Sequence, residues 1–356
     1  MSKTMNTFER VQRMYEHREA DRVPMQDSPW HTTLERWHRE GLPENISYVD
    51  YFDLDHFESI HVDTSPRFAE EVVEETDEYT IVTTSWGATL KNWKHIASTP
   101  EFLDFKINGP ESWAAAKERM QPTPDRIPWD HLRKNYKGWR ENGAWVIGQF
   151  WFGFDVTHSW TVGTERVLTA MALNPEWCMD MFGHFLHMSM TLMDMVWEAG
   201  YTFDAISWPD DMGYKYKQFF SLRMYRNLLK PFQKRAIEWA HAKRIKTHLH
   251  SCGNIEPFIP ELIEIGLDAL NPLEVKAGMD TLALKKQYGD QLVLHGGINA
   301  VHWDDPEKIM AEMETKLPVL KENGGYIFAS DHSIPDAVSL EDFANIVALY
   351  KKLGSY

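Results

Sequence analysis

The chain has 356 residues, of which 43% are hydrophobic, and it carries a formal net charge of −16. This length and apolar content suffice for a large folded core, whereas the negative charge disfavours nonspecific nucleic-acid binding, which needs cationic contacts to phosphates. The sequence contains no uncharged apolar run of about 18 residues and no signal-peptide pattern at its charged start, so a cytoplasmic protein that does not enter a membrane is expected.

The chain alternates short apolar runs with amphipathic helical patterns, which is typical of parallel strands joined by crossover helices. A helical extension is expected over residues 1–20, and an inserted β-hairpin or small antiparallel sheet over about 70–95, where β-branched residues alternate around Trp86 and Gly87. Strands are predicted within residues 22–31, 57–65, 144–153, 202–211, 244–253, 267–274, 291–299 and 325–333. Eight such units predict a single α/β domain over 1–356, a TIM (β/α)8 barrel with its site at the carboxyl ends of the strands.

Metal-capable side chains follow several of these predicted strands. His250 and Cys252 lie two residues apart in HLHSCGN, and because side chains alternate along a strand, both should point to the same side. The following runs end in further candidate ligands, namely Glu274, His295, Asp331 and His332. Several consecutive strands that end in ligands indicate one shared metal site. The other cysteine, Cys178, stands in an apolar helical run and is interpreted as a buried thiol; two cysteines cannot form a disulfide framework.

The segments DDMGYK, LKPFQKR, HLHSCGN, IPELIEIGLDALNPLE, AGMD and LHGGI make the chain resemble the uroporphyrinogen decarboxylase superfamily, which has a TIM-barrel fold and includes zinc methyltransferases. The resemblance implies zinc bound by His250, Cys252 and Glu274, with His332 where the coenzyme M branch has a second cysteine. Glu274 and His295 reproduce, with twenty residues between them, a spacing of corrinoid-dependent O-demethylases, but Ile259 stands where that branch has a glutamate. The zinc ligands therefore stay open among His250, Cys252, Glu274, His295 and His332.

The resemblance favours a methyltransferase that demethylates a methoxylated aromatic compound and passes the methyl group to the Co(I) centre of a corrinoid protein. No corrinoid-binding signature stands in the chain, so cobalamin would be carried by a separate partner. In the superfamily's decarboxylases the first strand is rich in arginine, whereas this chain has Asp27 there, which argues against decarboxylation of a porphyrinogen. The alternatives are a zinc methyltransferase acting on a thiol or amine, a decarboxylase of a small aromatic acid, and a noncatalytic barrel that binds a corrinoid or another flat ligand. Barrels of this superfamily often form dimers, so the resemblance also allows a homodimer.

Other polar and aromatic side chains near the predicted strand ends complete the candidate site. Buried carboxyl groups can stay protonated and act as general acids or hydrogen-bond a phenol. On this basis the expected catalytic residues are Asp210, Asp211 and Asp331, and the expected substrate-binding residues are Asp27, Asp63, Trp151 and His158.

Overall fold

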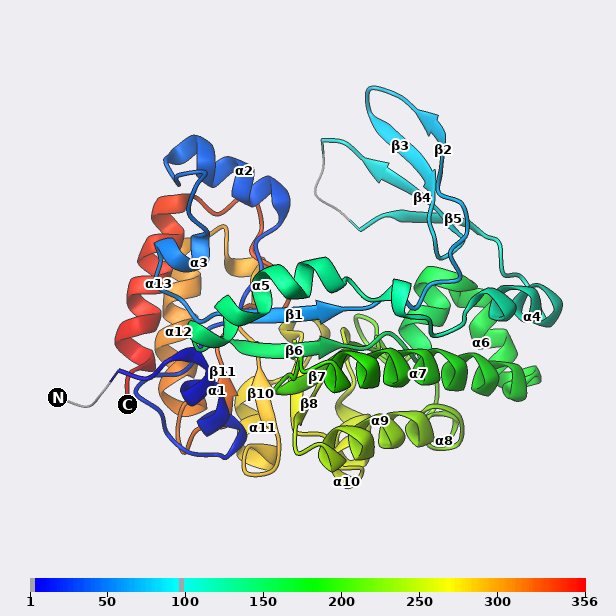
Figure 1. Ribbon diagram of the computed structural model, residues 1–356. Coiled ribbons are helices and arrows are strands. Elements are labelled where there is room, and N and C mark those ends of the chain that lie inside the picture. Colours follow the sequence, from blue (N-terminus) through cyan, green and yellow to red (C-terminus); the bar gives the residue numbers. More distant parts are fainter. Residues whose placement is uncertain (1–3, 96–98) are drawn as a thin grey trace.

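The sheet at the centre of the molecule is parallel, seven-stranded and curled (Figure 1). The computed structural model describes residues 4–95 and 99–356. The strands of the seven-stranded sheet lie in the order β1-β6-β7-β8-β9-β10-β11. From β6 onward, each strand therefore pairs with the next strand of this sheet along the chain. The strands are β1 Phe57–His61, β6 Trp145–Gln149, β7 Ala205–Pro209, β8 Lys246–His250, β9 Ala269–Asn271, β10 Val293–His295 and β11 Tyr326–Ile327. The predicted α/β barrel architecture is confirmed, in the form of an incompletely closed barrel.

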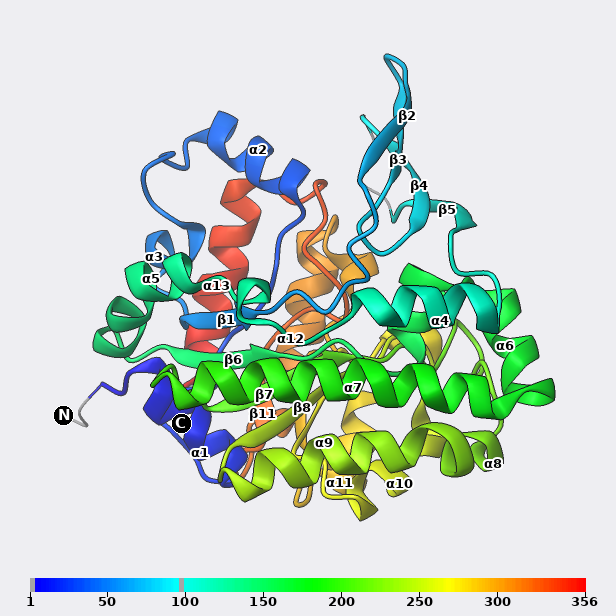
Figure 2. The same ribbon diagram turned by 45° about the vertical axis from the view of Figure 1, so that its right-hand side comes forward.

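Helices surround the outside of this sheet, as Figures 1 and 2 show. Parallel neighbours need crossover connections, and amphipathic helices supply them while covering the sheet's outer face. They are α1 Thr7–Tyr15, α2 His31–Glu40, α3 Tyr48–Tyr51, α4 Pro110–Arg119, α5 Trp129–Glu141, α6 Thr164–Leu173, α7 Pro175–Glu198, α8 Leu222–Met224, α9 Lys230–Ala242, α10 Ile259–Glu264, α11 Thr281–Tyr288, α12 Pro306–Leu320 and α13 Leu340–Gly354. Two π-helical segments, Val156–Thr161 and Tyr225–Leu229, lie within the connections that follow β6 and β7.

The first predicted strand, within residues 22–31, takes the eighth position without becoming a regular strand. Phe328, which follows β11, donates its backbone N–H to Pro24 at 2.8 Å and accepts from Gln26 at 3.1 Å. The pairing is short because Pro24 and Pro29 have no N–H to donate. The segment nevertheless carries Gln26 and Asp27 to the barrel interior beside β11.

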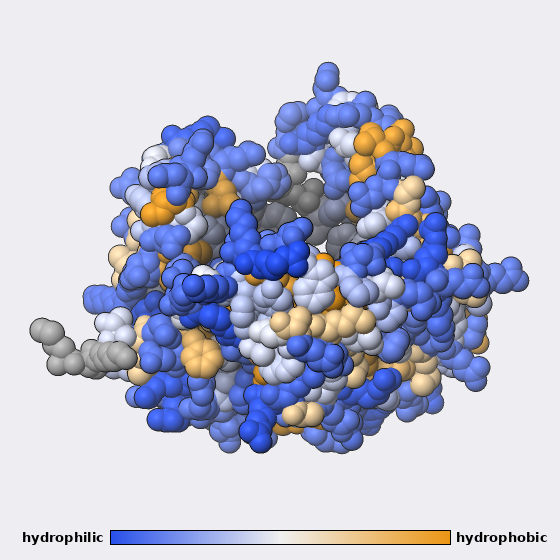
Figure 3. Space-filling model, in the orientation of Figure 1, coloured by the Kyte–Doolittle hydropathy of each residue, from blue (hydrophilic) through white to orange (hydrophobic). Residues whose placement is uncertain are grey.

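The expected insertion forms a four-stranded antiparallel sheet between β1 and β6, with strands β2 Glu71–Glu75, β3 Tyr79–Thr83, β4 Ala88–Trp93 and β5 Glu101–Phe105. It continues ten residues beyond the expected end at about 95, because β5 adds a fourth strand; residues 96–98 lie outside the described residues. Trp86 packs on Trp151 and Phe185, with ring centroids 6.0 and 5.8 Å apart, and so joins the insertion to the barrel. In the space-filling view the molecule is hollowed between this insertion and the α2 region (Figure 3).

The amino-terminal helix α1 closes one end of the barrel. Its residues Val11, Met14 and Tyr15 form a separate buried cluster with Trp145, Ala205, Ala269, Val293 and Ile327, four of which are the first residues of their strands. Helix α1 covers only residues 7–15 of the helical extension predicted over 1–20, of which residues 1–3 lie outside the described part. The carboxyl ends of the strands therefore open at the opposite end. Among the helices of the described chain, none has the length and apolar character that crossing a membrane requires.

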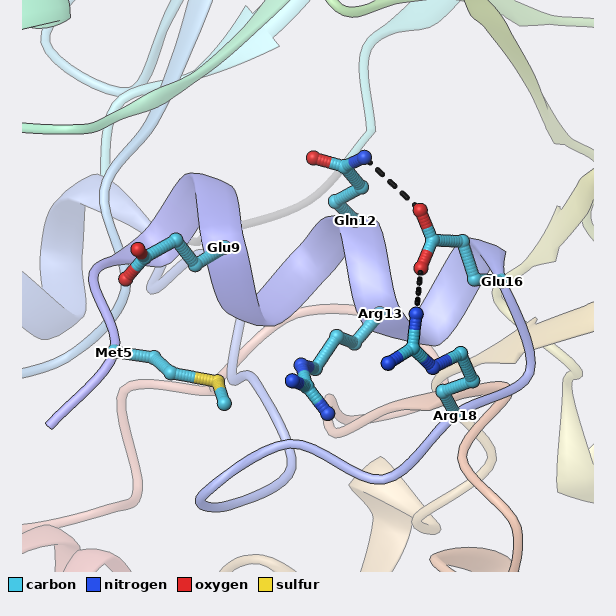
Figure 4. A pocket seen from close by; sticks show the side chains of 6 residues that line it. All are labelled: Met5, Glu9, Gln12, Arg13, Glu16 and Arg18. Carbon is cyan, nitrogen blue, oxygen red and sulfur yellow. Dashed lines mark hydrogen bonds and ion pairs between the residues drawn. The ribbon is translucent and has the colours of Figure 1, made fainter. Parts of the chain in front are cut away.

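The depression on the outer side of α1 offers little chemistry. It is lined by Met5, Glu9, Gln12, Arg13, Glu16 and Arg18, of which Gln12, Glu16 and Arg18 interact with one another (Figure 4). Glu16 accepts a hydrogen bond from Gln12 at 2.9 Å and pairs with Arg18 at 3.1 Å. The chemistry of the chain gathers instead at the carboxyl ends of the strands.

Candidate metal centre and barrel cavity

A cavity of about 330 Å³ lies in the barrel at the carboxyl ends of its strands. In parallel α/β barrels this end carries the active site, because the loops that follow the strands converge there. Most of the side chains that line the cavity are polar: Gln26, Asp27, Ser28, Ser59, Gln149, Ser207, His248, His250, Asn271, His295, Ser330, His332 and Ser333, with Ile147, Pro209 and Ala329.

Three side chains with ligand atoms converge at one side of this cavity. Asp211, His250 and Cys252 each offer an atom within 4.8 Å of the other two, and all three side chains are half-buried. The Cys252 Sγ lies 3.3 Å from His250 Nε2, and this nitrogen lies 3.8 Å from a carboxylate oxygen of Asp211. The structure thus brings the expected ligands His250 and Cys252 together. It adds Asp211, which the sequence analysis predicted as a catalytic acid and not as a metal ligand.

Two loops in close contact build this cluster. Gly253, after β8, has φ +78°, and a side-chain carbon there would lie 2.2 Å from the backbone of Gly213 in the loop after β7. Only glycine permits both the left-handed backbone and this approach. The contact places the Cys252 N–H 2.7 Å from Asp211, whose carboxylate accepts its hydrogen bond. The two loops are thereby fixed relative to each other.

Asn271, at the end of β9, fixes the orientation of the His250 ring. Its side-chain oxygen lies 2.5 Å from His250 Nδ1, while its amide nitrogen donates to the His295 carbonyl at 3.3 Å. Since an amide oxygen only accepts, His250 Nδ1 carries a proton, and in the neutral ring the lone pair is on Nε2, the nitrogen nearest Cys252. A histidine that donates through its outer nitrogen to an oxygen is the usual arrangement around a bound metal.

The electrostatics of the cluster favour a cation. Burial, with the carboxylates of Asp211 and Glu274 nearby, raises the pKa of the Cys252 thiol well above its usual range. Burial also raises the pKa of Asp211. A divalent cation would relieve both effects by stabilising the thiolate and the carboxylate. One nitrogen, one sulfur and one oxygen donor make three protein ligands. This set fits zinc, which in catalytic sites has three protein ligands and an open fourth position.

His295 is turned away from this cluster. Its Nδ1 lies 3.0 Å from His248 Nε2, and its Nε2 lies 3.1 Å from the carbonyl oxygen of Gln26. Both ring nitrogens are therefore engaged inside the barrel. Burial lowers the pKa of His295 to about 4, so the ring is neutral.

Glu274 and His332 lie around the cluster in different roles. Glu274 accepts a hydrogen bond from the Gly253 N–H at 2.6 Å and pairs with Lys276 at 2.9 Å, so it braces the loop that carries Cys252. His332 lines the cavity and stacks on Trp30, with ring centroids 5.8 Å apart.

Two of the expected catalytic acids are bound by backbone groups. Asp210 is buried and accepts from the N–H groups of Phe154 and Asp155, at 2.8 and 3.0 Å, and from the Gln233 amide at 2.8 Å. Asp331 is also buried and accepts from Val275 and Ala300, both at 2.7 Å. Satisfied in this way, both carboxylates hold loops in place behind the cavity wall.

Of the expected substrate-binding residues, Asp27 lines the cavity, while the other three lie elsewhere. Asp63 pairs with Arg67 at 2.5 Å, and Trp151 belongs to the aromatic contact with the insertion. His158 is buried against Phe154, with ring centroids 4.4 Å apart. In these positions, Asp63, Trp151 and His158 can support the walls around the site.

Asp27 accepts hydrogen bonds from the backbone and hydroxyl groups of Ser330, at 2.6 and 2.9 Å, and from the Ser28 N–H at 2.8 Å. Burial raises its pKa to about 7, against a usual value of 3.8. Between these values the unfolded chain has released the proton while the folded chain retains it, so rising pH stabilises the unfolded state.

We expect this carboxyl to leave a signature in the pH dependence of stability. From about pH 4 to about pH 7, the free energy of unfolding of the wild type should fall relative to that of Asp27→Asn, and the difference should level off above about pH 8. Urea unfolding across this range measures it. Asp130→Asn, at an acid whose side chain is 99% exposed, is the control and should show no such trend. A difference between wild type and Asp27→Asn that does not change with pH would contradict the assignment.

Several cavity residues escaped the sequence interpretation, above all His248, Ser207 and Asn271. For two of these three residues, the sequence contained a signal that could have identified them. His248 precedes His250 by two residues in β8, and Ser207 precedes Asp211 by four along β7 and its extension, so each shares a face with a predicted residue. Asn271 carried no such sign, because only the three-dimensional neighbour relation of β8 and β9 brings it to His250.

Comparison with known proteins agrees with this architecture. Residues 156–353, more than half of the chain, match the family model described as Uroporphyrinogen decarboxylase (URO-D). Among solved structures, a methyltransferase from Methanosarcina mazei is similar over 98% of this chain and 99% of its own, with a TM-score of 0.67 and 16% identity, which shows a shared fold. A B12-independent methionine synthase from Shewanella sp. W3-18-1 aligns over 82% of this chain and 74% of its own, with a TM-score of only 0.41 and 12% identity. Comparison with curated protein sequences gives no match.

Proposed function

Because the chain belongs to the uroporphyrinogen decarboxylase family, we propose that it is a methyltransferase built on that family's barrel. In this proposal it removes the methyl group of a methoxylated aromatic compound and passes it to the Co(I) centre of a partner corrinoid protein. The observation that carries the proposal is the convergence of Asp211, His250 and Cys252 at the cavity. This donor set suits a zinc ion held beside a small bound molecule.

The composition of the cavity weighs against the decarboxylation that gives the family its name. Among the described residues, those that line it include neither arginine nor lysine, and the first segment contributes Gln26 and Asp27. A porphyrinogen carries several carboxylates, which need cationic partners when they leave water. A cavity of about 330 Å³ is also small among ligand sites and suits a single substituted ring.

An aryl methyl ether reacts slowly because its leaving group is a phenolate, whose conjugate acid has a pKa of about 10. Zinc would act there as a Lewis acid on the ether oxygen. The chain's own residues would hold and orient the reactants: Asn271 would keep His250 Nε2 directed at the metal position, and the His332 ring, which stacks on Trp30, would offer a flat surface at the cavity. When the O–CH₃ bond breaks, its electron pair stays on the phenolate oxygen and the methyl group leaves with the acceptor.

The donor set also bears on the choice between an ether and a thiol substrate. Two thiolates make zinc electron-rich and suited to activating sulfur, whereas one thiolate with an imidazole and a carboxylate leaves it more Lewis-acidic. The cluster contains a single cysteine, Cys252, which favours polarisation of an oxygen.

The test is a demethylation assay. Purified protein with zinc, a reduced corrinoid acceptor and a panel of methoxyarenes should release the corresponding phenol, measured by chromatography, with matching loss of the Co(I) absorbance. Protein treated with a chelator should release none, and restored zinc should return the activity. Absence of phenol from every methoxyarene, with protein shown to contain its metal, would contradict the proposed function.

A further inference from the structure

A continuous line of hydrogen bonds crosses the inside of the barrel. The Ser207 hydroxyl of β7 lies 3.0 Å from His248 Nδ1, His248 Nε2 lies 3.0 Å from His295 Nδ1, and His295 Nε2 lies 3.1 Å from the Gln26 carbonyl oxygen. All three side chains are buried, at 8%, 9% and 4% exposure, and all three line the cavity. The line ends at a group that can only accept.

The carbonyl at this end sets the direction of every hydrogen bond. Because Gln26 O accepts, His295 Nε2 must carry the proton, and a neutral imidazole carries only one. His295 Nδ1 therefore accepts from His248 Nε2. His248 Nδ1 is then without a proton and accepts in turn, so the Ser207 hydroxyl donates to it. Both rings are buried inside the barrel, and burial disfavours the charged form of an imidazole.

Ser207 consequently has no proton left for a bound molecule. Its hydroxyl hydrogen is directed along the line to His248, and only its lone pairs remain for the cavity. Asn271, on the adjoining wall, already uses its oxygen to accept from His250 and one of its two N–H groups to donate to the His295 carbonyl. At Ser207, a ligand oxygen that can only accept would meet another acceptor, and a buried polar atom without a partner costs binding free energy.

We infer that Ser207 selects ligands that donate an O–H or N–H group, and that His248 and His295 impose this role on it through the tautomers they adopt. The ligand class rests on the proposed function: a methoxylated ring that also carries a free hydroxyl would bind, with that hydroxyl donating to Ser207. Ser207 would be a specificity-determining residue, and His248 and His295 positioning residues that act through it.

The test compares two probes, 2-methoxyphenol and 1,2-dimethoxybenzene, which share a methoxy group and differ in one O–H. Isothermal titration calorimetry on the full-length zinc-loaded protein, without corrinoid, should give roughly tenfold tighter binding of 2-methoxyphenol, the effect of one hydrogen bond satisfied or lost. Ser207→Ala should bring the ratio of the two affinities close to one. Wild-type affinities within about twofold, or a ratio that survives in Ser207→Ala, would overturn the inference.

His295→Leu separates the tautomer mechanism from a merely structural role. Without an acceptor at position 295, His248 can carry its proton on Nδ1 and donate to Ser207, whose own hydrogen then points into the cavity. The preference should then fall to about twofold or less, or reverse toward 1,2-dimethoxybenzene. Ser333→Ala, at a cavity serine outside the line, is the matched control and should keep the wild-type ratio. An unchanged ratio in folded His295→Leu would overturn the role of the histidines.

Binding and turnover are measured separately, so the two proposals fail separately. A donor preference with no demethylation would overturn the proposed function alone. Demethylation with no donor preference would overturn the inference alone. Failure of both probes to bind at about millimolar concentration would overturn the inference and its ligand class.

Discussion

Replacing His250 by alanine is expected to abolish metal binding. The substitution removes the one imidazole nitrogen whose lone pair points into the Asp211, His250 and Cys252 cluster, and it leaves a thiol and a carboxylate that burial pushes toward their protonated, non-ligating forms. Loss of an outer partner such as Asn271 typically weakens metal binding 10- to 100-fold, so loss of a ligand should weaken it by more than about 100-fold. Zinc content by elemental analysis and zinc affinity by chelator competition measure the effect.

The same measurement decides which of the five histidine, cysteine and glutamate candidates bind the metal. Cys252→Ser and Asp211→Asn should lose zinc as His250→Ala does. Glu274→Gln, His295→Ala and His332→Ala should retain about one zinc per chain, because their side chains are engaged with Gly253 and Lys276, with His248 and Gln26, and with Trp30, respectively. Cys178→Ser, at a fully buried thiol in α7, is the control for cysteine replacement. Folded His250→Ala that keeps stoichiometric zinc would exclude this centre.

The fold was largely predictable, because apolar runs of strand length separated by amphipathic helices leave few alternatives to a parallel sheet. Every strand from β6 to β11 lies inside a predicted run. The exceptions have local causes. Prolines at positions 24 and 29 shorten the pairing of the first segment, and β5 of the insertion lies in EFLDF, whose side chains are mostly exposed and give no buried pattern.

The candidate site was predictable where strand periodicity alone decides the position of a side chain. His250 and Cys252 lie together, as residues two apart on a strand end should. The same rule, continued from Ser207 and Pro209, separates Asp211 at the cluster from Asp210 behind the wall. It cannot foresee that His295 meets His248, because that contact depends on how far two rings reach across the barrel past β9.

Loss of the Asp55 side chain is expected to destabilise the chain strongly. Its carboxylate is completely buried before β1 and pairs with two arginines, Arg10 of α1 and, at 2.5 Å, Arg22. It also accepts the Met25 N–H at 2.9 Å. One carboxylate therefore ties the helix that plugs the barrel to the segment that carries Gln26 and Asp27.

Asp55→Ala should lower the free energy of unfolding by about 3 kcal/mol, because it leaves the buried Arg10 guanidinium with Asp21 as its remaining carboxylate partner and removes the buried carboxylate that pairs with Arg22. Urea unfolding followed by circular dichroism measures this. Asp55→Asn, which keeps an acceptor for Met25, should be less severe and remains measurable if the alanine variant does not fold. The matched control is Asp53→Asn, two residues away, where asparagine suits the left-handed backbone (φ +49°), the side chain is 93% exposed and the Lys351 pair contributes less than about 1 kcal/mol. A change below about 1 kcal/mol in Asp55→Ala would show that the ion pairs only break even with desolvation.

The position of the Gln26 carbonyl depends on the same segment, so a destabilised Asp55 variant should also lose the Ser207-dependent discrimination between the two probes before it unfolds globally.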